Sequence, residues 1–303
     1  MVNSIEKIME LSDGFRSPYI LQNAFNETQI NEDAVKDILN ECSKTNFESI
    51  KQRVYINDRK SKEFSIKVHQ NSVKQNETIN EWSLRVFGEN KFGIIINNAD
   101  KYNSDLKNKF KKVLDKLILI NGLPSGGFSM AIFIGNYPIS PIGIHIDKNL
   151  SNVLHFHLGP NDKEMILWDK VTYKKLIGHE LESYDPYLYK EFGQTFTLTK
   201  NCIFNLPAND FFHVGCNSGL SIGITIGFMK FTNEQFIENA LIELIQDLDL
   251  LQNKKDYLKL FDDFNIDNIK NPKEMTKNDL KELFIQAISH KKRKLLANDA
   301  FLY

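Results

Sequence analysis

A histidine and an aspartate, His145 and Asp147, are separated by one residue in the apolar segment IGIHID. Alternate residues of a β-strand project to the same face, so this spacing predicts an imidazole and a carboxylate that point together. A carboxylate inside a barrel is costly unless it is paired or binds a metal. A second histidine, His213, follows a proline-containing turn in NLPANDFFHV. Two histidines and one carboxylate on one side of a metal leave its other coordination positions open. That arrangement is typical of non-haem Fe(II) that binds a co-substrate and O2 together.

Short apolar segments separated by turn residues predict the strands that position these side chains. Their spacing is expected of a barrel or a sandwich of two sheets. The predicted strands are FSMAIFIG, IGIHID, NVLHFHLG, EMILWD, TFTLT, CIFNLP, FFHVG and LSIGITIGFMKF.

Helical patterns flank this β-rich block. Apolar residues at helical spacing predict one helix that starts after Asn31 and another over residues 104–120, which Gly122 ends. We predict surface strands and loops over residues 60–81. Thr232 and Gln235 form a capping-box pattern that opens a further helix, and a last helix is expected to start near Thr276.

The sequence therefore predicts a mainly β protein with flanking helices. Residues 1–100 form a mixed α/β N-terminal segment that packs on the core, and residues 101–232 form the catalytic core. Residues 233–303 form a C-terminal helical region for dimerisation or substrate docking. Their broad apolar faces predict a homodimer, because such faces are seldom left in water. Helices that only cover their own barrel are the alternative.

Composition narrows the class of protein. The chain has 303 residues, of which 42% are hydrophobic, and no apolar run approaches the length of a membrane span. It has 38 basic and 39 acidic residues, and this near-balance argues against nucleic-acid binding. Its three widely spaced cysteines offer no disulfide framework, and its polar N-terminus is unlike a signal peptide. We therefore expect a cytoplasmic protein with no membrane partner.

The stretch from Phe128 to Phe228 resembles the Jumonji-C and cupin-like 2-oxoglutarate-dependent oxygenases. The similar segments read FIGNYPISPIGIHIDKNLSNVLHFHLGPNDKEMILW and FNLPANDFFHVGCNSGLSIGITIGF. The resemblance implies a double-stranded β-helix, also called a jelly roll, whose catalytic Fe(II) is bound by His145, Asp147 and His213.

The same resemblance implies the residues that bind the co-substrate. Lys163 stands just before the strand EMILW, where such enzymes often place the basic residue that binds the distal carboxylate of 2-oxoglutarate. An ordinary solvated lysine of a hairpin is the alternative. Asn152, Tyr137 and Thr225 fall near positions that supply hydrogen bonds to 2-oxoglutarate.

His155 and His157 allow a competing interpretation. With His213 they loosely imitate the three-histidine site of simple cupins, which would make the protein a non-oxygenase metal-binding cupin. Otherwise one of the pair lines the co-substrate pocket and the other faces the core or the surface. Strand parity puts both on one face, so His157 is included among the co-substrate residues.

The function that the resemblance implies is an Fe(II)/2-oxoglutarate-dependent dioxygenase that consumes O2 and releases succinate and CO2. We expect it to hydroxylate an amino-acid side chain in a peptide or protein. A free amino acid or another small metabolite is the alternative substrate. A β-helix without catalytic activity that serves as a binding module is a third interpretation.

Overall fold

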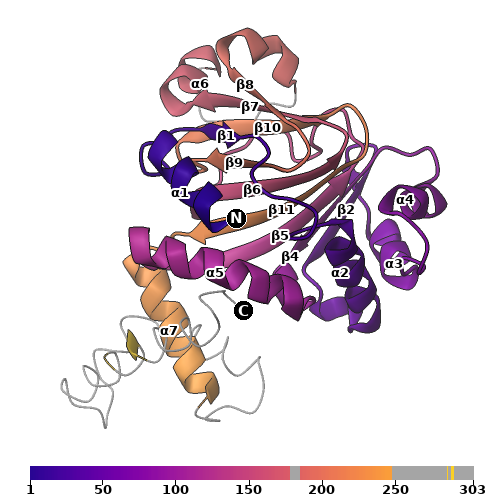
Figure 1. Cartoon of the computed structure of the whole chain (residues 1–303), viewed down its shortest axis with the longest axis horizontal. Coiled ribbons are helices and arrows are strands. Elements are labelled where there is room, and N and C mark those ends of the chain that lie inside the picture. The colour runs from indigo at the N-terminus through magenta and orange to yellow at the C-terminus, as the bar shows by residue number, and fades with distance from the viewer. Residues whose placement is uncertain (178–184, 248–284, 286–287, 290–303) are drawn as a thin grey trace, which may run out of the picture. The chain divides into compact units, whose positions relative to one another are not determined.

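The computed structural model describes residues 1–177 and 185–247, together with Ile285, Ile288 and Ser289. The chain divides into two compact units (Figure 1). The first comprises residues 1–124 and 128–229 and contains every strand given below. The second comprises residues 125–127 and 230–302 and contains helix α7 (Asn233–Asp247).

The strands of the first unit pair in a nested order. β5 (Phe128–Gly135) pairs with β11 (Ser221–Met229), and β6 (Leu150–Pro160) pairs with β9 (Cys202–Leu206). β7 (Lys163–Asp169) pairs with β8 (Gln194–Leu198), and β10 (Phe211–Asn217) is bridged to His145. In chain order the eight elements are β5, the segment around His145, β6, β7, β8, β9, β10 and β11. The first element thus pairs with the eighth, the second with the seventh, the third with the sixth and the fourth with the fifth. This antiparallel nesting defines a double-stranded β-helix, and the predicted fold class is confirmed.

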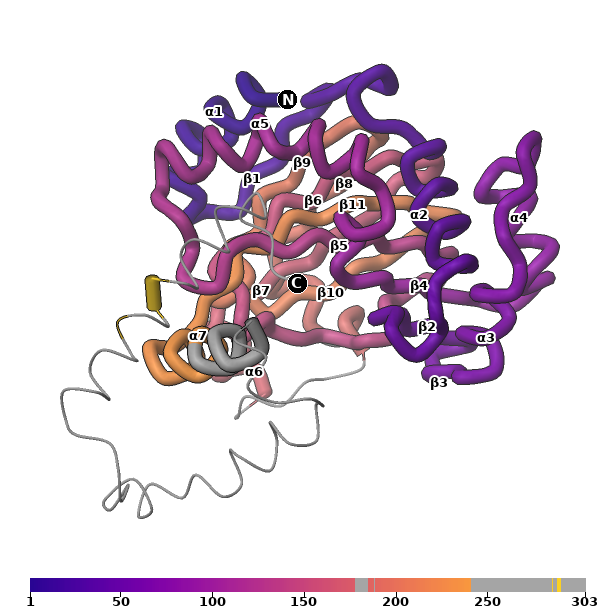
Figure 2. The backbone as a smooth tube through the Cα atoms, turned by 90° about the horizontal axis from the view of Figure 1, so that it is seen from below, coloured from indigo at the N-terminus to yellow at the C-terminus, as the bar shows by residue number. Residues whose placement is uncertain are grey.

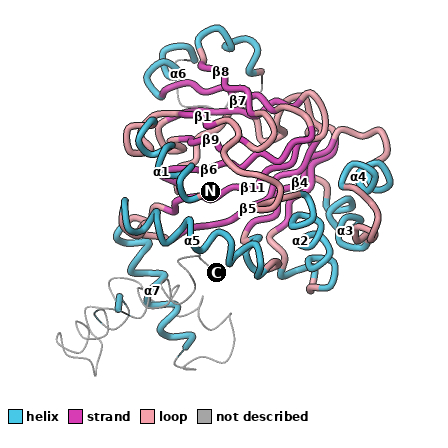
Figure 3. The backbone as a smooth tube through the Cα atoms, viewed as in Figure 1, coloured by secondary structure: helices cyan, strands magenta, loops and turns pink. Residues whose placement is uncertain are grey.

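The strands form two sheets (Figure 3). The eight-stranded sheet has the order β1-β9-β6-β11-β5-β4-β2-β3, and the three-stranded sheet has the order β10-β7-β8. The N-terminal segment extends the large sheet at both edges: β1 (Tyr19–Leu21) at one, and β4 (Phe92–Asn97), β2 (Gln52–Ile56) and β3 (Arg59–Lys60) at the other.

Helices cover the outer faces of both sheets, and the inner faces enclose the core and a cavity. Phe110 of α5 (Ser104–Asn121) packs edge-on against Phe156 of β6, with ring centroids 4.9 Å apart. Beyond the small sheet, Tyr173 of α6 (Lys170–Ile177) stacks on Phe212 of β10 at 4.0 Å. Phe196 and Phe204 meet between the sheets at 5.1 Å. Apolar residues therefore face both ways from these strands, and this explains their long hydrophobic runs.

The N-terminal segment adds helices α1 (Val2–Leu11), α2 (Glu32–Lys44), α3 (Lys62–Gln70) and α4 (Ile79–Phe87). Short 3-10 turns occupy Phe47–Ser49, Ala99–Lys101 and Pro186–Phe192. Helices α2, α3 and α4 lie at the same end of the large sheet in both views, and α3 packs on β2 (Figures 1 and 2). Asn31 caps α2 as expected, because its side chain accepts a hydrogen bond from the backbone of Ala34.

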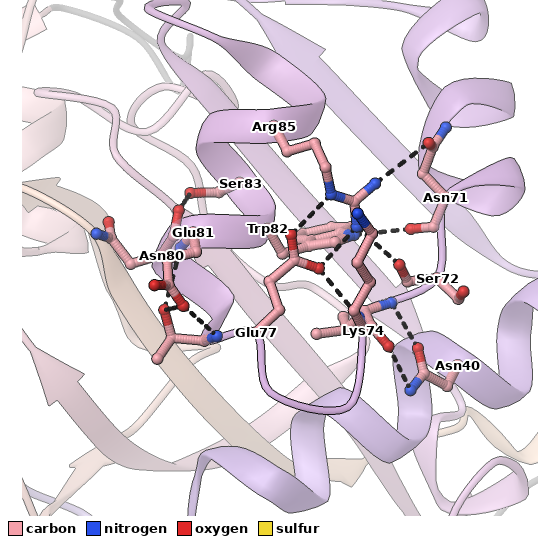
Figure 4. Close-up of polar contacts among 12 residues, drawn as sticks. Asn40, Asn71, Ser72, Lys74, Glu77, Asn80, Glu81, Trp82, Ser83 and Arg85 are labelled. Atoms are coloured by element: carbon pink, nitrogen blue, oxygen red, sulfur yellow. Dashed lines mark hydrogen bonds and ion pairs between the residues drawn. The ribbon is translucent and has the colours of Figure 1, made fainter.

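The prediction of strands and loops over residues 60–81 is wrong for residues 62–70 and 79–81, because local capping favours helices there, and residues 71–78 form the predicted loop. Ser61 accepts a hydrogen bond at the start of α3, and Thr78 with Glu81 forms a complete capping box at the start of α4. Arg85 then binds both carboxylate oxygens of Glu77 at 2.7 Å, which ties α4 to the preceding turn (Figure 4).

The segment IGIHID is not a regular strand. Only His145 forms a β-bridge, and a turn precedes it in which the backbone N–H of Gly143 donates to Ser140 at a φ of +77°. A second turn follows, because Leu150 donates to the carbonyl of Asp147. The two turns leave room for one bridge, and that bridge is enough to align the segment with β10.

The C-terminal region is described only in part. The capping box of Thr232 and Gln235 is confirmed by reciprocal hydrogen bonds of 3.0 and 3.2 Å. The helix expected near Thr276 lies almost entirely outside the described residues. Among the described helices, none combines the length and the apolar composition of a membrane span.

Candidate metal centre and co-substrate pocket

The structure brings His145, Asp147 and His213 together. Their ligand atoms all lie within 4.8 Å of one another. Oδ1 of Asp147 lies 3.9 Å from Nε2 of His145, and Oδ2 of Asp147 lies 3.7 Å from Nε2 of His213. His145 and Asp147 come from the turn-flanked segment, and His213 comes from β10 directly opposite. Three such ligands around one point form the donor set of a divalent transition metal.

Hydrogen bonds orient both imidazoles. Nδ1 of His145 donates to the carbonyl of Gly143 at 3.0 Å, and Nδ1 of His213 donates to the carbonyl of Phe211 at 3.2 Å. A carbonyl only accepts, so Nδ1 carries the proton and Nε2 keeps its lone pair. Both lone pairs therefore belong to the nitrogens that face Asp147, which is the tautomer that metal binding requires.

Burial keeps the histidine of β10 neutral. It lowers the pKa of His213 to about 4, and the neighbouring His145 adds to this effect. Asp147 opposes the shift, because a carboxylate favours the protonated imidazole. Asp147 and His145 retain 31% and 18% of their side-chain exposure, so the centre is open to solvent on their side. A ligand or substrate can approach from there.

The three residues line one cavity of about 250 Å³ between the two sheets. This volume lies below the roughly 300–1,000 Å³ of pockets for drug-sized ligands. The cavity is therefore of a size that suits a small ligand. Its floor consists of alternate residues of β5, β6 and β11, which project from the large sheet toward the small one.

Lys163, at the start of β7, is a buried cation in this cavity. Its side chain is 5% exposed, and among the described residues no carboxylate lies within ion-pairing distance of its Nζ. Nζ lies 5.9 Å from the ring centroid of Phe133 and 6.0 Å from that of Tyr137. Gly215 makes room for the chain, because a Cβ there would lie 2.8 Å from Cε of Lys163. The alternative of a solvated hairpin lysine is wrong, and the pocket has a cation for an anionic ligand.

Tyr137 and Thr225 also line the cavity. The ring of Tyr137 covers Gly93 and Gly135, where a Cβ would lie 3.0 and 2.5 Å from its Cε1. Thr225 of β11 is 8% exposed, and its hydroxyl contacts the carbonyl of Ala131 at 3.4 Å. Both residues offer hydroxyl groups beside the cavity that contains Lys163.

Asn152 lies on the other face of β6, outside the cavity. Its amide donates to the carbonyl of Phe15 at 2.6 Å, so it anchors the N-terminal segment. Val153 and His155 of the same strand line the cavity. Strand alternation alone separates Asn152 from these two residues, and the position of Asn152 does not fit a co-substrate ligand.

Of the histidine pair, His155 lines the cavity and His157 does not. His157 is fully buried, and its Nε2 hydrogen-bonds to the carbonyl of Asn161 at 2.9 Å. Burial lowers the pKa of both imidazoles, that of His157 to about 4. Within the described residues, the group able to bind a metal contains neither His155 nor His157, so the geometry does not support the three-histidine site.

Sequence reasoning missed Arg53 of β2 and Asn97 of β4, which line the same cavity. Both strands belong to the N-terminal segment. β4 pairs with β5 and β2 pairs with β4, and this pairing brings the two residues to the pocket. The alternation of QRVYI could have indicated a strand, but nothing in it identifies β4 as its partner.

No protein-family model matches the chain, and no curated protein matches it in sequence. Among solved structures, it is similar to E. coli YcfD at a TM-score of 0.48 and 14% identity, over 95% of this chain and 69% of that one. YcfD, described as a ribosomal oxygenase, gives a TM-score of 0.47 at 12% identity in its complex with cobalt and succinic acid, over 95% and 68%. Its complex with cobalt and 2-oxoglutarate gives 0.45 at 14%, over 93% and 67%. At these values the likeness assigns neither a family nor an activity to this chain.

Proposed function

We propose that this protein is an Fe(II)- and 2-oxoglutarate-dependent dioxygenase. One observation carries the proposal: a three-ligand centre and an unpaired buried lysine line the same small cavity between the sheets. The donor set of two imidazoles and one carboxylate suits Fe(II). The lysine suits the second carboxylate of a small dianion whose other end reaches the metal.

Each residue has a distinct task in this proposal. His145, Asp147 and His213 hold the metal on one side and leave its other side open to the cavity. Lys163 binds the distal carboxylate of 2-oxoglutarate, with Tyr137 and Thr225 as further polar contacts. When bound, iron and 2-oxoglutarate supply the oxidising chemistry with O2, so that a C–H bond is hydroxylated and succinate and CO2 are released.

We assign the substrate to peptides or proteins. The cavity is small, and the metal-binding residues remain partly exposed on one side. A single side chain can therefore enter while the rest of a polypeptide stays outside. A free amino acid or small metabolite is the second candidate, and it would have to fit inside the cavity with 2-oxoglutarate.

The proposal extends to a cytoplasmic homodimer. Free cysteines support a reducing compartment: Cys42, Cys202 and Cys216 are all buried and unpaired as disulfides. Apolar residues at helical spacing in the sequence, among them Phe236, Ile237 and Leu241, support a dimer built by residues 233–303. Within those residues, the part after Asp247 lies almost entirely outside the described chain.

The decisive experiment is release of succinate from 2-oxoglutarate by the iron-loaded protein. A non-oxygenase cupin and an inactive binding module share the fold but release none. Metal analysis separates these two, because the binding module would hold no iron.

A further inference from the structure

The cavity extends sideways, beyond the strands of the β-helix proper. Registered pairing places Asn97 of β4 beside Ala131 of β5, and Ala131 beside Thr225 of β11. One row further along the strands, Arg53 of β2 pairs with Ile95, and Ile95 pairs with Phe133. Arg53 and Asn97 line the cavity together with the metal-binding residues. The N-terminal segment thus adds a polar extension to the pocket, which consists of Arg53 and Asn97 and is called the side arm below.

Arg53 is partly exposed at the edge of the cavity, and one donor of its guanidinium is buried. Its Nε is buried and has no hydrogen-bond partner among the residues that the structure describes. No carboxylate of the described chain forms an ion pair with its guanidinium. A buried donor without a partner is costly, so such a group is typically completed by a water molecule or a ligand. A guanidinium presents parallel N–H groups that match the two oxygens of a carboxylate.

The co-substrate does not account for this second cation. Lys163 lies against Gly215, two residues from His213 on β10, so it stands beside the metal-binding residues. Arg53 stands two strands beyond Phe133, on the side arm. A dianion with one end at the metal and the other at Lys163 leaves Arg53 unpaired. The only carboxylate that lines the described cavity is Asp147, which is a metal ligand.

We propose that Arg53 binds a carboxylate of the molecule that is oxidised, so that the substrate is acidic. This inference rests on the proposed function. The carboxylate belongs either to an acidic side chain of a peptide or to a free acidic amino acid. Both sources present the same group to Arg53, and Asn97 lines the same side arm with an amide that suits hydrogen bonding to the substrate.

The test measures binding without turnover. The full-length protein is loaded with Mn(II) and 2-oxoglutarate without O2. It is then equilibrated with two libraries of short blocked peptides. One library has Asp or Glu at its central position, and the other has Asn or Gln there. Retained peptides are quantified by mass spectrometry. Wild-type protein should retain the acidic library about 10- to 100-fold more strongly, as expected of a hydrogen bond to a charged group.

Three variants make the comparison specific. Arg53→Gln should lose the preference for acidic peptides, and Arg53→Lys should keep part of it. Arg59→Gln, which changes an exposed arginine of β3, should behave as wild type. Retained Mn(II) shows that each variant is folded. If Arg53→Gln fails this check, the comparison of Arg53→Lys with wild type decides, because an unchanged preference would exclude bidentate binding by Arg53.

Equal retention of the two libraries by wild-type protein, including no retention of either, overturns the inference. The same acid preference in Arg53→Gln also overturns it. Competition by free aspartate or glutamate identifies a small-molecule source, and its absence identifies a peptide. Succinate release is measured separately: its absence refutes the proposed function, whereas loss of acid preference refutes only the role of Arg53.

Discussion

His145 and His213 are joined by two backbone hydrogen bonds, of 3.1 Å from N of His145 to O of His213 and 2.8 Å in the reverse direction. Their ring centroids lie 4.3 Å apart. The backbone therefore holds the two imidazoles side by side. Pre-arranged ligands lose little entropy on binding a metal, so the centre is ready to accept one.

Removing a ligand should release the metal. Wild-type protein purified without O2 should bind about one Fe(II) per chain, because its three ligands converge on one point. His145→Ala and Asp147→Ala should lose it, as measured by metal analysis. His69→Ala is the control, since His69 contacts the carbonyl of Thr45 outside the cavity. Full iron content in Asp147→Ala together with loss in His157→Ala would instead establish the three-histidine site.

Lys163→Ala should raise the concentration of 2-oxoglutarate needed for half-maximal succinate release while iron stays bound. Loss of a charge-assisted partner costs about 1.5–3 kcal/mol, or roughly 10- to 150-fold. Lys190→Ala serves as the matched control, because Lys190 pairs with Glu164 outside the cavity. An unchanged requirement in Lys163→Ala would show that another residue binds the distal carboxylate.

Acid should destabilise the metal-free protein through His157. Burial lowers the pKa of this imidazole from 6.5 to about 4 in the folded state. Below pH 6.5 the His157 imidazole binds a proton in the unfolded chain, whereas in the folded chain it binds one only near pH 4. The contribution of His157 to the free energy of unfolding is therefore fully present above pH 6.5. It declines toward pH 4 by an amount on the order of 3 kcal/mol.

Urea unfolding at several pH values measures this effect. His157→Asn should lose less stability than wild type over that interval, because asparagine does not titrate. Parallel curves for the two proteins would show that His157 titrates normally in the folded chain.

The β-helix was predictable because its signals are local. Apolar runs such as SIGITIGFM are separated by turn residues, and each run except IGIHID becomes a strand. The triad was predictable for a similar reason, since one-residue spacing fixes the common face of His145 and Asp147. That argument needs only an extended backbone. It therefore holds even though IGIHID forms a single β-bridge and not a regular strand.

The remaining site depends on long-range pairing that local sequence does not encode. Arg53 reaches the cavity only because β2 pairs with β4 and β4 pairs with β5. His155 and His157 share a face of β6, but only His155 lines the cavity. Its ring covers Gly223, where a Cβ would lie 2.5 Å from its Nε2. Ser61 and Thr78, by contrast, are local capping signals for helices α3 and α4.

Light scattering at micromolar concentration tests the proposed homodimer. Leu241→Glu with Leu244→Glu should give monomers, because charges in this apolar pattern of the sequence would oppose burial between subunits. Leu84→Glu with Leu119→Glu is the matched control, since these leucines are 53% and 78% exposed on α4 and α5. A monomeric wild-type protein, or a folded dimer of the α7 variant, would contradict the proposal.

Turnover of 2-oxoglutarate against a peptide digest of cell extract tests the central claim most directly. The iron-loaded protein is supplied with 2-oxoglutarate and isotopically heavy O2, and Asp147→Ala is run beside it. We predict that wild-type protein releases succinate and that a peptide gains one heavy oxygen atom, because the triad and Lys163 hold the reactants in one cavity. Succinate release no greater than that of Asp147→Ala from a protein shown to contain iron would contradict the account.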